Sequence, residues 1–406
     1  MDRQGSGNRI DNYIEYGRVI VFDLFGTILD NISNDYQKGL DWLKGEILYD
    51  DCSSEDVQRI TERFRRMYML DRTATHREIS IKMQLELFRS EVGFKKDLSL
   101  DEIEYGFFTA MRITEQRDGL RELLTWLKGM NYSIYIMSNT TFSATTIKRH
   151  LEDHGIAGYF DEVYTGGDCG HRKPGRSFFS SVFNDIKKQR LIRKSDVIFV
   201  GSSLEKDIFG SKRFGFTPIW ISYERDGFGE YMAECDRVKD LRECTEYLMN
   251  NFICVAGVPK KYSVADGFGN RLVIHLQGCY RHCHGCHNKQ TWDPLKGKIY
   301  NVKELVTETL SRMSKHARNV TISGGEPMEQ SRPLTTLINM FKRAGVNVCL
   351  YTACDINEIP DEIMEKIDYL KTGEYLHKMR MTEKGHLGSS NQKLWKKEDG
   401  KWIQVI

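Results

Sequence analysis

Short apolar runs alternate with longer segments of helical spacing in the first part of the 406-residue chain. The run RVIVFD at 18–23 predicts a buried strand that carries Asp23 into the following loop. Three later runs, at 132–138, 196–200 and 217–222, predict further strands with helical segments between them. Strands that alternate with helices indicate a parallel sheet with right-handed crossovers, so we expect an α/β fold.

A long helical segment interrupts this alternation after the first strand. In residues 36–115 the apolar positions recur at the spacing of amphipathic helices, and Ser53 or Ser54 provides a capping signal for one of them. The pattern predicts four helices that pack as a small inserted bundle. A polar helix near 236–250, followed by CVAGVPKK, marks the expected end of this domain.

The alternation of strands and helices resumes at about residue 252. Strands are expected at 271–277, 319–323, 346–352 and 368–372, and helices at 301–314, 332–344 and 361–367. Near the end of the chain, EDGK separates two alternating runs and predicts a hairpin turn. We therefore expect an N-terminal extension at 1–17, one α/β domain at 18–245 and a second at 252–406.

Composition narrows the class of protein. Apolar residues make up 40% of the chain and charged residues 29%, as in globular proteins that are soluble in water. The chain has no apolar run of about 18 residues, and its first residues lack the apolar core of a signal peptide. We therefore expect a cytoplasmic protein without a membrane span.

Positive charge is concentrated in the last part of the chain. Residues 252–406 contain 23 Lys and Arg against 16 Asp and Glu, a net charge of +7, whereas the rest of the chain carries −5. The excess suits an anionic ligand or an acidic partner, and it equally suits a solvated surface. Nucleic acid is not expected as a partner, because no dense Lys/Arg block with interleaved aromatic residues occurs.

Ten cysteines in a reducing compartment indicate ligands, buried thiols or catalysis rather than disulfides. Cys279, Cys283 and Cys286 lie in GCYRHCHGCHNKQTW at 278–292, directly after a predicted strand. Functional residues of α/β folds often lie on such loops, and thiolates select iron–sulfur clusters or zinc. The other cysteines lack ligand spacing and are expected to be inert, although Cys354 follows a loop that is expected near this site.

The cysteine loop also carries His282, His284 and His287. One of these imidazoles could complete a zinc site, which needs a fourth ligand. They could instead donate hydrogen bonds to the sulfur atoms of a cluster and tune its potential. The sequence leaves their role open.

A second loop, SGGEP at 323–327, follows the next predicted strand, and its two glycines allow close approach to a ligand. Further motifs in the region are DGFGNRLVIHLQGCYRHCHGCHNKQTW at 266–292, YTA at 351–353, TGEY at 372–375 and GSSNQ at 388–392. With these motifs, the domain resembles the activating enzymes of glycyl radical enzymes in the radical S-adenosylmethionine (SAM) superfamily. It is most similar to the activases of anaerobic ribonucleotide reductases.

The resemblance implies that Cys279, Cys283 and Cys286 hold a 4Fe-4S cluster with one open iron that binds SAM. The implied SAM contacts are Ser323, Gly324, Gly325, Glu326 and Thr352. The implied reaction is reduction of the cluster by one electron, cleavage of SAM to methionine and a 5′-deoxyadenosyl radical, and hydrogen abstraction. The implied fold is a truncated α/β barrel, and the implied partners are a glycyl radical enzyme and an electron donor such as flavodoxin or ferredoxin. Gly285 replaces the aromatic residue that is usual in the superfamily, which the reductase-type activases tolerate.

Four further motifs occur in order in the first domain. They are VIVFDLFGTILD at 19–30, IMSNT with Ser138, HRKPG with Lys173, and VGSSLEKD ending at Asp207. This set resembles the haloacid dehalogenase (HAD) superfamily, which implies a Rossmann-like core with a helical cap at about 31–115. It implies that Asp23 is a covalent nucleophile and that Ser138 and Lys173 hold the anionic group. Asp207 would anchor Lys173 or, with Asp23, bind magnesium.

Two departures from the HAD pattern concern the chemistry. Phosphatases of the superfamily carry a second Asp as general acid two residues after the nucleophile, where this chain has Phe25. Their fourth motif usually reads Gly-Asp, where this chain has Gly201 and Ser202. Loss of a positioned acid typically costs roughly 10²–10⁴-fold in rate. The domain is therefore either a hydrolase of another kind, such as a metal-free dehalogenase, or a binding module.

These observations lead to one expected function and two alternatives. The expected function is a radical SAM activase of the glycyl radical type, fused to a HAD-like hydrolase or binding domain. In the first alternative, both halves act on one small metabolite, for instance a phosphorylated one, because tethering raises the local concentration of an intermediate. In the second, the HAD half is an inactive regulatory scaffold.

Overall fold

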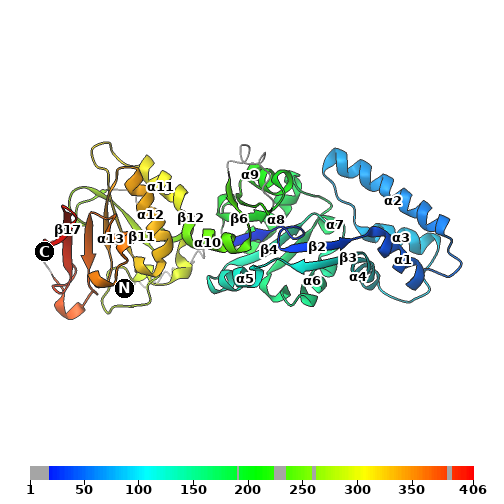
Figure 1. The fold of residues 1–406 in the computed structure, drawn as a ribbon, viewed down its shortest axis with the longest axis horizontal. Coiled ribbons are helices and arrows are strands. Elements are labelled where there is room, and N and C mark those ends of the chain that lie inside the picture. Colours follow the sequence, from blue (N-terminus) through cyan, green and yellow to red (C-terminus); the bar gives the residue numbers. More distant parts are fainter. Residues whose placement is uncertain (1–17, 190–191, 224–234, 258–261, 382–385) are drawn as a thin grey trace, which may run out of the picture. The chain divides into compact units, whose positions relative to one another are not determined.

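The computed structural model describes residues 18–406, except for 190–191, 224–234, 258–261 and 382–385. The chain divides into two compact units, residues 17–246 and 247–406, and each is described by itself (Figure 1). Within the described residues, no helix is both long and apolar enough to cross a membrane.

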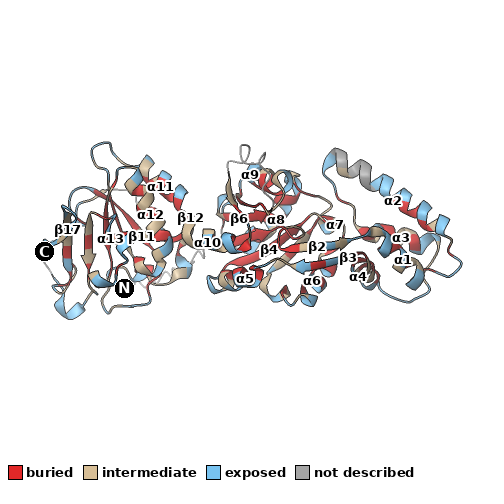
Figure 2. Ribbon diagram, in the orientation of Figure 1, coloured by how far each residue is buried: buried red, intermediate tan, exposed pale blue. Residues whose placement is uncertain are grey.

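A six-stranded parallel sheet forms the centre of the N-terminal unit. Its strands, in spatial order, are β5 (Glu162–Thr165), β4 (Ser133–Ser138), β1 (Val19–Phe22), β6 (Val197–Gly201), β7 (Thr217–Ile221) and β8 (Asp236–Val238). All four residues of β1 are buried (Figure 2), which accounts for its uninterrupted apolar sequence. The four predicted strands are confirmed. The short strands β5 and β8 were not predicted, and β8 lies where the sequence predicted the start of a helix.

Helices cover both faces of this sheet (Figure 1). They are α5 (Leu120–Gly129), α6 (Ala144–Asp153), α8 (Arg176–Gln189), α9 (Gly210–Phe214) and α10 (Leu241–Asn251). Helix α8 buries Phe178 and Val182 against Val19 and Val21 of β1. The short helix α7 (Gly166–Cys169) follows β5 and leads into the segment that contains Lys173.

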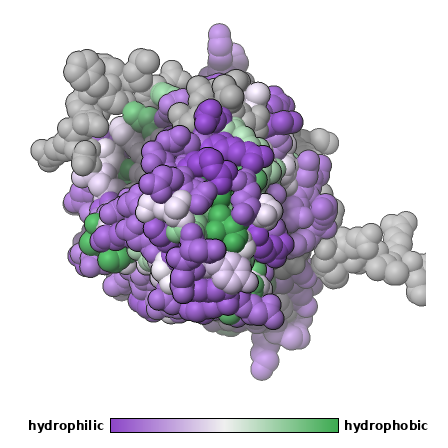
Figure 3. Space-filling view, turned by 90° about the vertical axis from the view of Figure 1, so that its right-hand side faces the viewer, coloured by the Kyte–Doolittle hydropathy of each residue, from purple (hydrophilic) through white to green (hydrophobic). Residues whose placement is uncertain are grey.

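The cap consists of helices and a two-stranded ribbon. The helices are α1 (Tyr36–Glu46), α2 (Ser54–Thr75), α3 (Ile81–Glu91) and α4 (Leu100–Met111), as the sequence predicted. Ser53 is the N-cap of α2 and forms a capping box with Asp56. The face of the molecule on the cap side is mostly hydrophilic, with small hydrophobic patches (Figure 3).

The strands of the ribbon correct the prediction that residues 36–115 are helical throughout. Residues Arg112–Gln116 form β3, which pairs antiparallel with β2 (Leu29–Asn34). The pairing joins Leu29 to Gln116 and Asn34 to Arg112. A strand of five residues cannot be distinguished by periodicity from the end of the preceding helix, because its partner lies far away in the sequence.

The C-terminal unit is built on a nine-stranded mixed sheet. Eight strands follow the order β12 (Lys298–Asn301), β9 (Phe252–Gly257), β11 (Arg271–Leu276), β13 (Asn319–Gly324), β14 (Asn347–Tyr351), β15 (Tyr369–Thr372), β16 (Lys393–Glu398) and β17 (Lys401–Gln404). The ninth, β10 (Tyr262–Ser263), pairs with β11. The central strands β11, β13, β14 and β15 are parallel, and the outer strands are antiparallel. Residues 252–257, which the sequence placed around a domain boundary, therefore belong to this sheet.

Helices α11 (Val302–Ser311), α12 (Ser331–Arg343) and α13 (Asp361–Met364) complete the C-terminal unit. Leu334, Leu337 and Phe341 of α12 are buried against Ile322 and Leu350 of the sheet. The predicted hairpin is confirmed, because Glu398 pairs with Lys401 across a turn. Asp399 and Gly400 in that turn have φ values of 47° and 78°, as a two-residue turn of type I′ requires.

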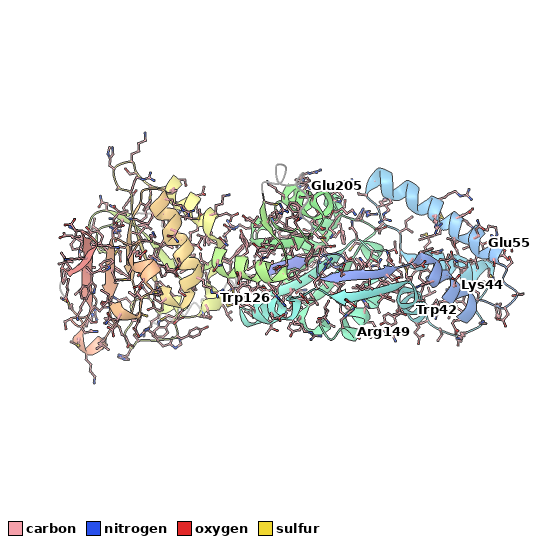
Figure 4. The ribbon with its side chains drawn as sticks, in the orientation of Figure 1. Trp42, Lys44, Glu55, Trp126, Arg149 and Glu205 are labelled. Atoms are coloured by element: carbon pink, nitrogen blue, oxygen red, sulfur yellow. The ribbon has the colours of Figure 1, made fainter. Side chains whose placement is uncertain are left out.

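The close crossing of α1 and α4 in the cap gives a prediction about stability. A Cβ atom at Gly106 would overlap the ring of Trp42 (Figure 4), so Gly106→Ala overpacks this crossing. Overpacking lowers the free energy of unfolding by about 1–3 kcal/mol, and the better helix propensity of Ala raises it by about 1 kcal/mol. We therefore expect net destabilisation of the cap. Hydrogen exchange of the α4 amides measures the change.

Gly45→Ala is the matched control, because an added Cβ at that position of α1 meets no atom within 4 Å. It should stabilise the cap by about 0.5–1 kcal/mol through helix propensity alone. Equal protection of α4 in both variants would contradict the packing described here.

Candidate active sites

The cysteine loop of the C-terminal unit begins where β11 ends, and backbone hydrogen bonds close it. The N–H of Gly278 donates to the carbonyl of Thr291 over 2.8 Å, and the N–H of Cys279 donates to that of Trp292 over 2.9 Å. The two ends of the loop are thus held together. The three cysteines between them lie at the carboxyl end of a parallel strand, where the sequence predicted them.

The loop after β13 lies directly against the cysteine loop. The N–H of Gly325 donates to the carbonyl of Leu276 and the N–H of Glu326 to that of Gly278, each over 2.9 Å. A Cβ atom at Gly325 would overlap the carbonyl oxygen of Gly278, and Gly324 has a φ of 109°. The sequence predicted that these glycines allow close approach to a ligand, whereas the atoms they approach here belong to the neighbouring loop.

Glu326 joins these two loops to the loop after β14. Its Oε1 accepts hydrogen bonds from Thr352 Oγ1 over 2.6 Å and from the N–H of Met328 over 3.0 Å. Its Oε2 accepts from the N–H of Ala353 over 2.8 Å and lies 3.8 Å from Nε of Arg281. The side chain is almost completely buried, and its hydrogen bonds to two loops hold the carboxylate in one position.

A cavity of about 160 Å³ lies among these loops. The residues predicted for the cluster and for SAM all line it: Cys279, Cys283, Cys286, Ser323, Gly324, Gly325, Glu326 and Thr352. Three soft thiols that face one cavity are a donor set that fits a 4Fe-4S cluster. The binding roles of the individual residues stay predictions, since no group of metal-ligating side chains within the described residues is already gathered at coordination distance.

Burial raises the pKa of the cysteine thiols in this cavity. For Cys283 the pKa is raised to about 11, first by burial, then by its hydrogen bond to Glu374 and by the neighbouring thiols. The pKa of Cys279 is also raised, mainly by burial. Both thiols are therefore protonated at neutral pH without a metal, and a metal must displace their protons when it binds.

The histidines of the cysteine loop pack against other rings. The ring of His282 lies 4.7 Å from that of Trp292, between centroids, and His284 lies 4.9 Å from His377. His287 lines the cavity and packs against Tyr375. These contacts orient the imidazoles without assigning them a chemical role.

Lys371 is a cavity residue that the sequence did not single out, and Tyr351 of the YTA motif lines the cavity with it. Burial lowers the pKa of Lys371 to about 8, and its Nζ lies 3.8 Å from the centroid of the Tyr351 ring. Lys371 forms no ion pair with the residues that the structure describes. Its position on the predicted strand DYLKT, beside buried Leu370, was the available signal.

Three charged residues form the centre of the N-terminal site. Nζ of Lys173 lies 2.7 Å from Oδ1 of Asp23 and 2.7 Å from Oδ1 of Asp207. Burial lowers the pKa of Lys173, but the two carboxylates outweigh burial, so the net shift is upward. Burial and the charge of Asp23 raise the pKa of Asp207. The sequence predicted all three residues: Asp23 directly follows β1, Asp207 lies in the helical turn Leu204–Phe209 after β6, and Lys173 lies in the segment before α8.

Neighbouring side chains hold this centre in place. Thr27 Oγ1 donates to Oδ2 of Asp23 over 2.7 Å and lies 3.1 Å from Oγ of Ser202. The N–H of Ser203 donates to Oδ2 of Asp207 over 2.9 Å. These contacts hold both carboxylates in place, and magnesium binding by Asp23 and Asp207 stays a prediction.

Ser138 ends β4, which pairs with β1 beside Asp23. It is buried, and its role in holding an anionic group stays a prediction. The next residue, Asn139, accepts a hydrogen bond from the backbone N–H of Lys173 over 2.8 Å and donates to its carbonyl over 2.9 Å. The amide of Asn139 thus fixes the segment that presents Lys173, a role that the sequence did not predict.

Phe25 occupies the position at which HAD phosphatases carry their acid. The guanidinium of Arg112, at the start of β3, stacks over its ring at 4.0 Å. Phe25 therefore supplies an apolar surface for a cation and has no proton to donate. The interpretation that ordinary phosphatase chemistry is disfavoured rests on this missing acid and stays a prediction.

Glu78 is a second residue of this unit that the sequence missed. It lies between α2 and α3, and its backbone N–H donates to the carbonyl of Gly170, shortly before Lys173. Its side chain is completely buried, with Arg172 and Arg72 at 3.7 and 3.9 Å. Burial raises its pKa to about 7. No motif marks the position, because its burial arises from tertiary contacts.

Comparison with known proteins identifies the C-terminal unit. Residues 265–395 match the family described as a 4Fe-4S single cluster domain. The anaerobic ribonucleoside-triphosphate reductase-activating protein of Enterobacteria phage T4 is 30% identical over 143 residues, which are 34% of this chain and 90% of that protein. The chain belongs to the radical SAM activase family. A second relative, the pyruvate formate-lyase 1-activating enzyme of Escherichia coli, is 28% identical over 149 residues, and the match spans 61% of its length.

The N-terminal unit of this activase is a HAD-like hydrolase domain, since residues 18–215 match the family described as haloacid dehalogenase-like hydrolase. Among solved structures, a HAD phosphatase from Thermococcus onnurineus is 22% identical, with a TM-score of 0.38, over 57% of this chain and 97% of that chain. A 2-haloacid dehalogenase from Pseudomonas syringae is 17% identical, with a TM-score of 0.41, and the match covers 57% of this chain and 98% of that chain.

The buried carboxyl of Glu78 gives a prediction about pH. An unfolded Glu has a pKa of about 4.3, so the folded activase binds one more proton at Glu78 than the unfolded chain between about pH 4.3 and 7. Its contribution to stability therefore falls as the pH rises through this window. From pH 5 to pH 8, the free energy of unfolding of Glu78→Gln should therefore rise by about 3 kcal/mol relative to that of wild type. Denaturant unfolding of the full chain measures both.

Glu86→Gln is the control, because Glu86 is half exposed in a surface pair with Arg89. Its unfolding midpoint should follow that of wild type at every pH. Parallel curves for wild type and Glu78→Gln would rule out an ionisable group at position 78 whose pKa depends on folding.

Proposed function

We propose that this activase installs a radical on a separate glycyl radical enzyme of the anaerobic ribonucleotide reductase type. The observation that carries the proposal is the single cavity lined by the three cysteines, the loop Ser323–Glu326 and Thr352. Two relatives support it, because by their names they activate anaerobic ribonucleoside-triphosphate reductase and pyruvate formate-lyase.

The protein's part in this reaction is to hold and orient. Cys279, Cys283 and Cys286 would ligate the cluster, which leaves one iron for SAM. When bound, the reduced cluster would supply one electron to SAM, whose cleavage to methionine would give a 5′-deoxyadenosyl radical that abstracts hydrogen. Glu326 would keep the loops after β11, β13 and β14 at constant separation, so that the two groups bind in one geometry.

Lys371 would contact the carboxylate of SAM. It is a half-buried cation of the cavity without an ion pair among the described residues, and a carboxylate would neutralise it. Arg281 is less suited to this contact, because its guanidinium already lies against Glu326 and Cys354. An external one-electron donor such as a flavodoxin or ferredoxin would reduce the cluster.

For the HAD-like half, we propose a metal-free site at which Asp23 is a nucleophile or a binding group. The observation in favour is that Lys173 lies between Asp23 and Asp207 and occupies the space between the two carboxylates. Both alternatives, a shared small metabolite and a regulatory scaffold, remain compatible with this arrangement. Turnover of a haloacid or a phosphate ester that Asp23→Asn abolishes would favour the first.

The proposed cluster gives a prediction about SAM cleavage. The anaerobically reconstituted and reduced protein should form 5′-deoxyadenosine from SAM, and Cys283→Ala should lower the rate at least about 100-fold, because a cluster ligand is lost. Chromatography of the nucleoside measures the rate, and metal analysis gives the iron content. Cys169→Ala, in the other unit, is the control and should keep the wild-type rate.

Zinc in place of iron in the purified protein, together with the absence of 5′-deoxyadenosine, would refute the radical reaction.

The proposed partner gives a separate prediction. Reduced activase with SAM and the purified glycyl radical enzyme of the same organism should produce a glycyl radical doublet in the electron paramagnetic resonance spectrum. Cys283→Ala should abolish the doublet. If 5′-deoxyadenosine forms but no protein radical appears, and a small metabolite becomes labelled from deuterated SAM or loses hydrogen, the shared-metabolite alternative replaces the proposal.

A further inference from the structure

Two motifs of the C-terminal unit, TGEY at 372–375 and GSSNQ at 388–392, have no role in the functions described above. The structure brings them together at the cavity of the three cysteines. Each motif contributes two residues to its lining: Gly373, Tyr375, Gly388 and Gln392. The two motifs therefore form one wall of that cavity.

Gln392 holds the start of the TGEY loop. Its Nε2 donates to the carbonyl of Gly373 over 2.9 Å. Its Oε1 accepts from the N–H groups of Gly388 and Ser389 over 2.8 and 3.3 Å. The side chain is buried and both ends of its amide are hydrogen-bonded, so the loop starts at a fixed point.

Asn391 and Ser389 hold the rest of the loop. Nδ2 of Asn391 donates to the carbonyl of Glu374 over 2.8 Å. Oγ of Ser389, which is completely buried, accepts from the N–H of Leu376 over 3.2 Å. Hydrogen bonds that do not depend on a ligand therefore fix the main chain on both sides of Glu374.

Glu374 lies against the cysteine loop. Sγ of Cys283 donates to its Oε1 over 3.4 Å, so this carboxylate contacts a predicted cluster ligand directly. The ring of the next residue, Tyr375, packs against that of His287 with 5.5 Å between centroids. Glu374 is exposed, and it forms no ion pair within the part of the chain that the structure describes.

Two other carboxylates lie near the cysteine loop, those of Glu326 and Glu329. Both accept hydrogen bonds from backbone N–H groups, which offset part of their negative charge. Glu374 accepts from the thiol of Cys283, whose proton is lost when the sulfur binds iron. Among these three carboxylates, the charge of Glu374 would therefore be the least offset beside a bound cluster.

This charge would act on a cluster held by the three cysteines. The carboxylate would stay near the sulfur of Cys283, because the main chain on both sides of it is fixed. Negative charge beside an iron–sulfur cluster opposes the addition of an electron and lowers the reduction potential. The cations of the cavity lining, Arg281 and Lys371, act in the opposite direction.

We propose that Glu374 lowers the reduction potential of the cluster and thereby makes the reduced cluster a stronger electron donor to SAM. The GSSNQ side chains act through Glu374, as positioning residues. The electron that the cluster gains is the one that an external donor of the flavodoxin or ferredoxin class loses. The inference rests on the proposed function, since it requires the 4Fe-4S cluster at the three cysteines.

A redox titration of the reconstituted full chain without SAM tests the proposal, with the reduced cluster followed by electron paramagnetic resonance. Glu374→Met removes the charge, keeps the length of the side chain and adds no hydrogen-bond donor to the sulfur. We expect it to raise the equilibrium constant for reduction about tenfold, a shift of about 59 mV for one electron. Glu374→Asp keeps the charge and should stay closer to wild type than to Glu374→Met.

Glu308→Met is the matched control, because Glu308 pairs with Arg312 on the surface of α11 and lies outside the cavity lining. It should leave the potential unchanged. Asn391→Ala tests the positioning role. It should raise the same equilibrium constant about threefold, because the carboxylate moves away from the sulfur. Combined with Glu374→Met, it should have no further effect.

The outcomes separate this inference from the proposed function. A wild type with a reducible cluster, whose potential is unchanged or lower in Glu374→Met, would overturn the inference alone. Equal shifts by Asn391→Ala with and without Glu374→Met would overturn the positioning role. A wild type without a reducible cluster would refute the proposed function, and the inference with it. If Glu374→Met takes up no iron, Asn391→Ala decides, and a wild-type potential then overturns the inference.

Discussion

The radical site depends on the contact between two backbone segments that follow neighbouring parallel strands. The N–H groups of Gly325 and Glu326 donate to the carbonyls of Leu276 and Gly278, and a side chain at position 325 would prevent this. Because these hydrogen bonds continue the pairing of β11 with β13 beyond the sheet, the two loops inherit the geometry of the strands. The sheet therefore sets the positions of Gly278, Gly325 and Glu326 at the cavity, and positioning of two cofactors requires such support.

The N-terminal site obtains its geometry from electrostatics as well as from the sheet. Asp23 follows β1 and Asp207 lies in the helical turn after the adjacent strand β6, and the ammonium of Lys173 between them compensates their repulsion. A buried cation with two carboxylates is stable only when the remaining acceptors are also satisfied, and Thr27 and Ser203 provide these hydrogen bonds. The carboxyl edge of a parallel sheet thus carries a charge cluster in one unit and a thiol-lined cavity in the other.

The sequence predicted those parts of the molecule that are determined locally. Buried strands such as VIVF, the turn at Asp399 and Gly400, and the order of the motifs all follow from neighbouring residues, and the structure has them. Strand β3 was missed because its partner lies more than 70 residues away in the chain. Glu78 and Lys371 were missed for a related reason: their importance comes from burial, and burial depends on segments that are distant in the sequence. Gly325 was recognised, but the atoms it approaches could be identified only in three dimensions.

The ribbon formed by β2 and β3 has a consequence for how such a protein could have been assembled. Leu29 and Gln116 are paired, so the chain leaves the core and returns to it at neighbouring points. Paired residues of antiparallel strands are about 5 Å apart between Cα atoms, a distance that a short turn can bridge. The cap is therefore a module that can be acquired, exchanged or lost without any change in the order of the core strands. Ligand preference in this unit can evolve through the cap while the charge cluster of the core is retained.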